Sequence, residues 1–222
     1  CYYNRGLAKF KLEDYEGAID DYTKAIEINP SNENAYHNRA ATKDSLEDYE
    51  GAIADYTKAI EINPTYESAF YNRGLVKFDL EDYEEAIVDI SKAIEINPSE
   101  AKYFFQRGKL KGCLKDYASS IDDFNIAIEI DPDEEKYFIL RSQSKANLND
   151  FSSAIDDNTK AIEINPEDSL YFYLRGLNKA RLNDFSSAIE DYTKAIDINP
   201  ENDEYFYDRA VAKNRTNEYS AA

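Results

Sequence analysis

The sequence predicts an all-α protein in which one helix–turn–helix repeat recurs along the chain. Three observations lead to this prediction. Successive prolines lie 34 residues apart with no insertion or deletion between them, at Pro30, Pro64, Pro98, Pro132, Pro166 and Pro200. Each proline closes a copy of Glu-Ile-Asn-Pro or a close variant of it. Between the prolines, apolar residues recur with the period of a helix. A fixed period of this size indicates an array whose repeats pack on their neighbours and share a continuous core.

Residues 1–34 show how one repeat is built. A first helix is predicted by apolar or small residues spaced with a period of about 3.6 residues: Tyr2, Gly6 and Leu12. A second helix is predicted by residues that follow the i, i+3, i+4, i+7 rule: Tyr15, Ala18, Ile19, Tyr22, Ala25 and Ile26. Between them, Glu13 and Asp14 supply an N-terminal cap and negative charge for the second helix. Pro30 ends that helix, because the residue before a proline is disfavoured in α conformation.

Carried along the chain, this pattern predicts thirteen complete helices and the start of a fourteenth, with a partial repeat at residues 201–222. Glycine recurs near the middle of the first helix, where it costs about 1 kcal/mol relative to alanine. The positions are Gly6, Gly74, Gly108 and Gly176, with Ala40 and Ala210 in other copies. We therefore expect the two helices of a repeat to cross closely there. The fifth repeat is expected to be the weakest, because Asn158 replaces a large residue seen as Tyr22, Tyr56, Ile90, Phe124 and Tyr192.

This repeat resembles the tetratricopeptide repeat. The resemblance rests on the 34-residue length and on seven positions of the first copy: Tyr2, Gly6, Tyr15, Ala18, Tyr22, Ala25 and Pro30. It covers residues 1–222 as a single array. It implies an all-α right-handed superhelical solenoid of helix–turn–helix repeats, in which the first helices line a concave groove.

Two columns of charge depart from the family pattern. Arginine stands where the family usually has a bulky apolar residue: Arg5, Arg39, Arg73, Arg107, Arg141, Arg175 and Arg209. Lysine stands where it usually has an aromatic residue: Lys9, Lys43, Lys77, Lys111, Lys145, Lys179 and Lys213. Aspartate recurs on the inward face of the second helices: Asp21, Asp55, Asp89, Asp123, Asp157 and Asp191. Since a partly buried arginine needs an acceptor, we expect an Arg–Asp ladder, within repeats or between neighbours. The alternative is that the basic stripe binds an anionic ligand.

The overall charge limits the possible partners. A net charge of −19 disfavours nucleic acid and anionic membrane surfaces, which bind through Lys and Arg. Apolar runs are only a few residues long, so we expect no transmembrane helix or secretory signal in this stretch and favour a cytoplasmic location. Cys1 and Cys113 lie three repeats apart, too far for a disulfide. Cys1 shares a helical column with Ala35 and Ala69, which favours a helix already under way over a lipid-modified terminus.

No arrangement of residues indicates catalysis. The one histidine, His37, has no positioned partner and shares its column with aromatic residues. Calcium-loop, C-x-x-C and glycine-rich phosphate motifs are missing, so we expect no metal or other cofactor. Some members of the resembled family hold a C-terminal carboxylate with a clamp of lysine, asparagine and arginine. Asn4, Asn38 and Asn72 match its asparagine column, but its lysine–asparagine pair is missing, so that function is not implied.

The predicted function is a non-catalytic scaffold that binds a peptide or helix of a partner protein in the groove. The expected groove residues are Tyr3, Leu7, Phe10, His37, Tyr71, Leu75, Phe78, Phe105, Lys109, Tyr173, Leu177 and Tyr207. Apolar clusters of this kind suit hydrophobic anchors of a ligand, and Lys109 is expected to select an acidic residue.

Three alternatives to this prediction remain open. The rings could serve only in helix packing, or the array could be a structural spacer or assembly rod within a larger protein. It could also be the regulatory arm of an enzyme. Apolar faces at the Tyr2/Leu7 end and the Tyr205–Tyr207 end predict end-to-end self-association.

Overall fold

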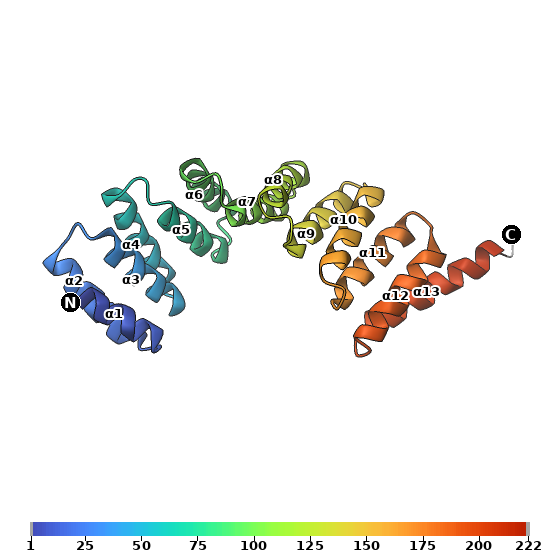
Figure 1. The fold of residues 1–222 in the computed structure, drawn as a ribbon, viewed down its shortest axis with the longest axis horizontal. Coiled ribbons are helices and arrows are strands. Elements are labelled where there is room, and N and C mark those ends of the chain that lie inside the picture. The colour runs from blue at the N-terminus through green and yellow to red at the C-terminus, as the bar shows by residue number, and fades with distance from the viewer. Residues whose placement is uncertain (1, 221–222) are drawn as a thin grey trace. The chain divides into compact units, whose positions relative to one another are not determined.

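The computed structural model of the protein describes the backbone of residues 2–220 and the side chains of residues 2–216. Within that range it consists of helices and short turns, with no strand (Figure 1). The helices are α1 (Tyr2–Lys11), α2 (Tyr15–Ile28), α3 (Glu33–Ser45), α4 (Tyr49–Ile62), α5 (Glu67–Asp79), α6 (Tyr83–Ile96), α7 (Ala101–Cys113), α8 (Tyr117–Ile130), α9 (Glu135–Asn147), α10 (Phe151–Ile164), α11 (Ser169–Arg181), α12 (Phe185–Ile198) and α13 (Asp203–Ser220). Odd-numbered helices are the first helices of the repeats. The all-α repeat fold is confirmed.

The chain divides into two compact units, Cys1–Leu110 and Lys111–Ala222. In the N-terminal unit, α1 packs on α2, α3 on α4 and α5 on α6, and α2 and α4 also pack on the first helices that follow them, α3 and α5. In the C-terminal unit, α8 to α13 pack in the same consecutive order. Helices therefore pack mainly on their neighbours in sequence, as a repeat array requires.

The turn inside each complete repeat holds one residue in the left-handed region. In the first repeat Glu13 has φ 62°, and the amides of Glu13 and Asp14 donate to the carbonyls of Phe10 and Lys9 at 3.0 Å each. This pair of hydrogen bonds is the Schellman motif that closes a helix. The equivalent residues have φ between 61° and 63°: Glu47, Glu81, Lys115, Asn149 and Asn183. None is glycine, so each Cβ crowds the next carbonyl at a cost of about 1–2 kcal/mol.

An aspartate starts the second helix, as the sequence predicts. The carboxylate of Asp14 accepts a hydrogen bond from the amide of Gly17 at 3.1 Å, and the cap recurs at Asp48, Asp116, Asp150 and Asp184. At the other end, Asn29 leaves the helical region with φ −136° and ψ 91°. Its side chain accepts from the amide of Ser31 at 3.2 Å. The recurring Asn-Pro is therefore a helix stop with its own turn.

The core of a repeat pairs small residues with large ones. Alanines on the second helices are fully buried: Ala18, Ala52, Ala86, Ala154 and Ala188. A Cβ added to Gly6 would lie 2.7 Å from a ring carbon of Tyr22, and one added to Gly176 would lie 2.7 Å from Tyr192. Such a separation is too short for carbon atoms, so glycine marks the close crossing that the sequence predicts. Burial of the ring also raises the pKa of Tyr22 to about 12.

The expected start of a fourteenth helix is wrong. Helix α13 continues from Asp203 to Ser220, through the positions at which the six earlier repeats turn. Thr216 stands where those repeats have a leucine before the turn. Cys1 lies outside the described residues, as does the end of this segment. Cys113 is exposed and carries a free thiol.

Candidate functional site

The arginine and aspartate columns form the expected ladder in five repeats. The Nε and Nη2 atoms of each arginine donate to both carboxylate oxygens of the aspartate sixteen residues later, at 2.6–2.9 Å; the pairs are Arg5–Asp21, Arg39–Asp55, Arg73–Asp89, Arg141–Asp157 and Arg175–Asp191. Two parallel hydrogen bonds make this a strong, directional contact. In the first pair, the hydrogen bond from Arg5 holds the pKa of Asp21 far below its usual range.

The lysine column joins the same network, which the sequence did not predict. The Nζ atom of Lys43 lies 2.8 Å from a carboxylate oxygen of Asp55 and 3.3 Å from the carbonyl oxygen of Gly51, to which it donates. Equivalent pairs have distances of 2.7–3.2 Å: Lys9–Asp21, Lys77–Asp89, Lys111–Asp123, Lys145–Asp157 and Lys179–Asp191. In each repeat where both pairs occur, two cations share one buried aspartate.

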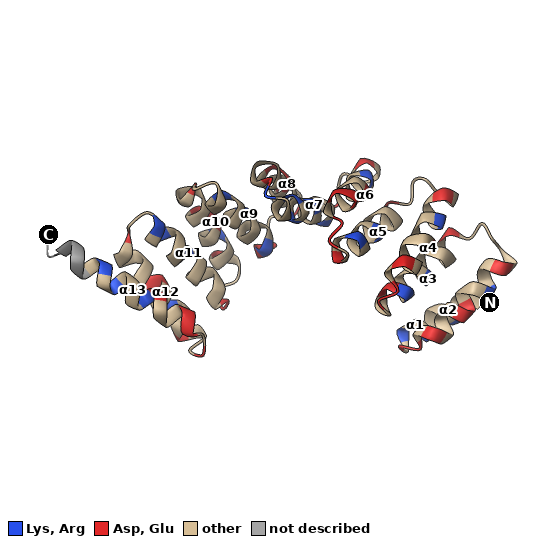
Figure 2. Ribbon diagram, turned by 180° about the vertical axis from the view of Figure 1, so that it is seen from behind, with Lys and Arg blue, Asp and Glu red and all other residues tan. Residues whose placement is uncertain are grey.

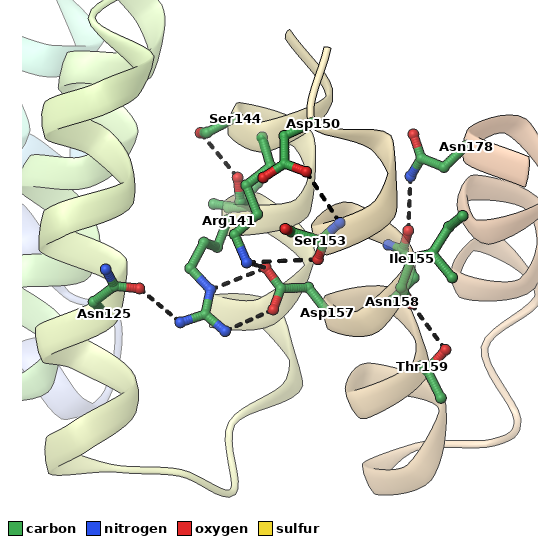
Figure 3. Close-up of polar contacts among 12 residues, drawn as sticks. Asn125, Arg141, Ser144, Asp150, Ser153, Ile155, Asp157, Asn158, Thr159 and Asn178 are labelled. Atoms are coloured by element: carbon green, nitrogen blue, oxygen red, sulfur yellow. Dashed lines mark hydrogen bonds and ion pairs between the residues drawn. The ribbon is translucent and has the colours of Figure 1, made fainter. Parts of the chain in front are cut away.

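A third arginine nitrogen connects each repeat to the one before it. Nη1 of Arg141 donates to the side-chain oxygen of Asn125 on α8 at 2.7 Å, while its other nitrogens pair with Asp157 on α10 (Figure 3). The same bond joins Arg39–Thr23, Arg73–Thr57, Arg107–Ser91, Arg175–Thr159 and Arg209–Thr193. Because the arginines and lysines that pair with aspartates are satisfied within the protein, this part of the stripe is a structural element rather than an open anion site.

The expected groove residues lie on the first helices. In the N-terminal unit they are Tyr3, Leu7 and Phe10 on α1, His37 on α3, Tyr71, Leu75 and Phe78 on α5, and Phe105 and Lys109 on α7. In the C-terminal unit they are Tyr173 and Leu177 on α11 and Tyr207 on α13. Tyr207 is 70% exposed, and the others are half-buried. They form neither the closed core nor a fully solvated surface.

Part of this face is used in packing. The ring centroids of Tyr71 and Tyr103 lie 4.8 Å apart. The Lys109 ammonium lies 5.1 Å from the ring centroid of Phe78 and 5.8 Å from that of Phe105. These contacts fix the positions of the rings relative to the neighbouring helices.

His37 is packed among aromatic rings. It stacks on Tyr66 with centroids 5.0 Å apart and meets Tyr56 edge-on at 5.4 Å. Its Nε2 lies 3.5 Å from the side-chain nitrogen of Asn72. Its buried Nδ1 has no hydrogen-bond partner in the described part of the chain. Burial lowers the pKa of His37 to about 4, because a charged ring would lose its hydration here. At neutral pH the imidazole is therefore uncharged.

Two adjoining hollows occur on the first helices of the C-terminal unit. The first, here called the amide pocket, has a volume of about 380 Å³ and is lined by Ser142, Gln143, Ala146, Asn147, Asn149, Phe151, Leu174, Leu177, Asn178 and Arg181. The second, here called the apolar pocket, has a volume of about 220 Å³ and is lined by Leu177, Ala180, Arg181, Phe185, Tyr192, Asp208, Val211 and Ala212. Leu177 and Arg181 line both, so the pockets share a wall.

Asn158 is buried next to a wall residue of the amide pocket. The side-chain nitrogen of Asn178 donates to the side-chain oxygen of Asn158 at 2.8 Å (Figure 3). Asn158 is fully buried, yet its own Nδ2 has no partner among the residues that the structure describes. Tyr192 fills the equivalent position of the next repeat. A short amide thus replaces a ring here, which supports the expectation of a weak fifth repeat.

Charge of both signs is spread over the helices of each unit (Figure 2). In the part of the chain that the structure covers, no group of three or more His, Cys, Asp or Glu residues is arranged to hold a metal ion. Within the same limits, every helix is too short or too polar to cross a membrane.

Family comparisons agree with the repeat geometry. Sequence models of the family described as Tetratricopeptide repeat match residues 1–32, 21–54, 68–100 and 170–202, and one described as TPR repeat matches residues 45–80. Together they span more than half of the chain. The chain belongs to the tetratricopeptide repeat (TPR) family. No curated protein matches its sequence significantly.

Solved structures share the TPR fold. YrrB, described as a TPR protein with an unusual peptide-binding site, has a TM-score of 0.75 and 26% identity, covering 84% of this chain and 96% of YrrB. A structure from the characterisation of Pseudomonas aeruginosa pilF has a TM-score of 0.76 at 18% identity, covering 94% and 95%. MamA has a TM-score of 0.70 at 21% identity, covering 73% and 95%. The family match supports a protein-interaction scaffold, and the neighbours show the shared fold.

Sequence reasoning on this TPR chain missed much of the lining of the two pockets. Leu177 was expected, but Asn178 and Arg181 were not. Arg181 lies four residues after Leu177, so a further step of the i, i+4 rule would have found it. Its column alone does not single it out, because the equivalent positions hold Lys11, Ser45, Asp79, Cys113, Asn147 and Arg215.

Proposed function

We propose that this TPR protein is a non-catalytic scaffold that binds a peptide or helix of a partner protein on the faces of its first helices. The observation that carries the proposal is the row of half-buried aromatic and aliphatic side chains on those helices. Exposed apolar area of this kind is typical of interaction surfaces. The peptide-binding site named for YrrB supports a peptide as ligand.

In the N-terminal unit, the proposed contact surface is centred on α5. Tyr71, Leu75 and Phe78 follow the i, i+4, i+7 spacing of one helix face and are half-buried. Lys109 stands over the ring of Phe78 and has no carboxylate within 4 Å in the described structure. Apolar anchors of a ligand would cover the rings, and an acidic residue of the ligand would pair with Lys109.

An assembly rod without a groove ligand is the second candidate. It is favoured by apolar side chains exposed on α1 and α13: Tyr2 is 37%, Phe206 41% and Tyr207 70% exposed. End-to-end association through these residues would give sedimentation coefficients that rise with concentration. A Tyr207→Ser, Phe206→Ser variant would then sediment as a monomer at every concentration.

The groove proposal is tested by selection from a displayed library of random twelve-residue peptides. Peptides recovered with the wild type should lose binding to the double variant Tyr71→Asn, Leu75→Gln. They should keep binding to the matched control Val88→Gln, which changes an apolar residue of α6 that is 61% exposed. Helicity and melting temperature should stay close to wild type in both variants. Collapse of the double variant's melting would mean that these residues are core, and loss of binding in Val88→Gln would place the ligand elsewhere.

A further inference from the structure

We propose that the amide pocket and the apolar pocket are adjoining subsites for one extended peptide, which places an Asp or Glu side chain in the first and an apolar side chain in the second. This inference rests on the proposed function and specifies its ligand in the C-terminal unit.

The amide pocket is built for polar groups. Gln143, Asn147, Asn149 and Asn178 line it with carboxamides, each of which carries both a donor and an acceptor. The nitrogen of Asn178 is already bonded to Asn158 at 2.8 Å, so its oxygen is the free acceptor. The oxygen of a carboxamide can accept a hydrogen bond from a peptide backbone N–H, and its nitrogen can donate one to a side-chain carboxylate.

Charge selects an acidic side chain for this pocket. Arg181 is exposed and, in the described structure, has no carboxylate within 4 Å, although the chain carries 45 acidic residues against 26 basic ones. Other arginines, such as Arg141 and Arg175, are held by aspartates. Arg181 therefore offers a guanidinium without a counter-ion at the pocket wall, where it can bond a carboxylate in two places.

The buried amide beside the pocket fixes the position of one of its polar side chains. Asn158 is fully buried and its Nδ2 has no partner among the described residues. A buried unpaired donor costs about 1–3 kcal/mol, and apolar residues serve at equivalent positions such as Ile90 and Phe124. Asn158 instead fixes Asn178 through a hydrogen bond, which orients that carboxamide at the pocket wall.

The apolar pocket takes the second side chain. Ala180, Phe185 and Val211 line it, and its one carboxylate, Asp208, already accepts a hydrogen bond from the Tyr173 hydroxyl at 2.7 Å. The negative charge of Asp208 disfavours an acidic side chain there. Packed helices lie about 10 Å apart and an extended chain advances about 3.3 Å per residue. The acidic and apolar residues should therefore be about three positions apart.

The test is an array of capped ten-residue peptides with Glu, Gln or Lys at one position and Leu or Ser three positions later. Wild-type protein should be retained about tenfold more by Glu–Leu than by Gln–Leu peptides, as expected for one charge-assisted contact, and least by Lys–Leu peptides. Replacing Leu by Ser should lower retention further. Arg181→Gln should remove the preference for Glu over Gln, and Arg181→Glu should reverse the order of Glu and Lys.

Lys11→Glu is the matched control, because Lys11 is the exposed residue at the equivalent position of the first repeat. It changes the net charge equally and should leave the order intact. Equal effects of Lys11→Glu and Arg181→Glu would mean that the preference for Glu comes from the net charge of the protein and not from a contact with Arg181, which would overturn the inference. If Arg181→Glu still prefers Glu–Leu over Lys–Leu peptides while the double variant Tyr71→Asn, Leu75→Gln retains no peptide, these two subsites are overturned but the proposed function is not. No retention of any peptide would overturn the proposed function with them.

Discussion

The ladder of shared aspartates predicts that the same Asp→Asn substitution has different costs in stability at two neighbouring positions of one column. In the second repeat, the side chain of Asp55 is 6% exposed, and those of its partners Arg39 and Lys43 are 16% and 20% exposed. Asp55→Asn keeps the shape but leaves two buried cations without a counter-charge. Breaking a buried pair in this way costs about 3–5 kcal/mol.

In the first repeat, Asp21 is buried but Arg5 is 56% exposed. Solvent screens the cation left by Asp21→Asn, so its cost should be markedly smaller. The assay is urea unfolding followed by circular dichroism, with amide hydrogen exchange of α3 and α4 to locate the effect, because repeat arrays need not unfold in one step. Equal losses in the two variants, or no loss in Asp55→Asn, would refute the reasoning.

Three further predictions concern pH, turns and local stability. The pKa of His37 is about 4 in the folded protein and about 6.5 in the unfolded chain. As the pH falls, the imidazole is therefore protonated in the unfolded state before it is protonated in the folded state. Stability should therefore fall by up to about 3 kcal/mol between pH 6.5 and 4, and His37→Tyr should remove this component in pH-dependent melts. Glu47→Gly should raise stability by about 1 kcal/mol because φ is 61° there, whereas Glu47→Ala should not; equal denaturation midpoints would contradict this. Amides of α9 and α10 should exchange faster than those of α11 and α12, since Asn158 leaves a buried donor unpaired; equal protection would contradict it.

The fold could be predicted because each local signal recurs in register. Asn29-Pro30 stops a helix, Asp14 starts one, and Gly6 admits the Tyr22 ring, and each of these effects acts within a few residues or across one helix contact. The arginine–aspartate pairing was predictable for the same reason, because burial requires an acceptor and one column supplies it. The turn expected before residue 218 does not form, and Thr216 replaces the leucine that precedes each earlier turn.

The candidate site was harder to predict because it depends on departures from the repeat. The column of Arg181 mixes cations with other residues, so the repeat pattern does not single it out, and the departure at Asn158 predicts a weak repeat but not the hydrogen bond to Asn178. The role of the lysines was also missed: the sequence predicts an arginine–aspartate ladder only, whereas the Nζ of Lys43 lies 2.8 Å from Asp55, the aspartate that also pairs with Arg39. Half-burial of Tyr71 and Leu75 follows from helix crossing, which sequence columns do not measure.

The central claim is that ligands contact the first helices. Its most direct test is a map of amide chemical-shift changes when a library-selected peptide is added to isotopically labelled protein. The account predicts changes concentrated on odd-numbered helices, with α5 and α11 among them and the exposed faces of α6 and α12 unaffected. Changes concentrated on the even-numbered helices would contradict it.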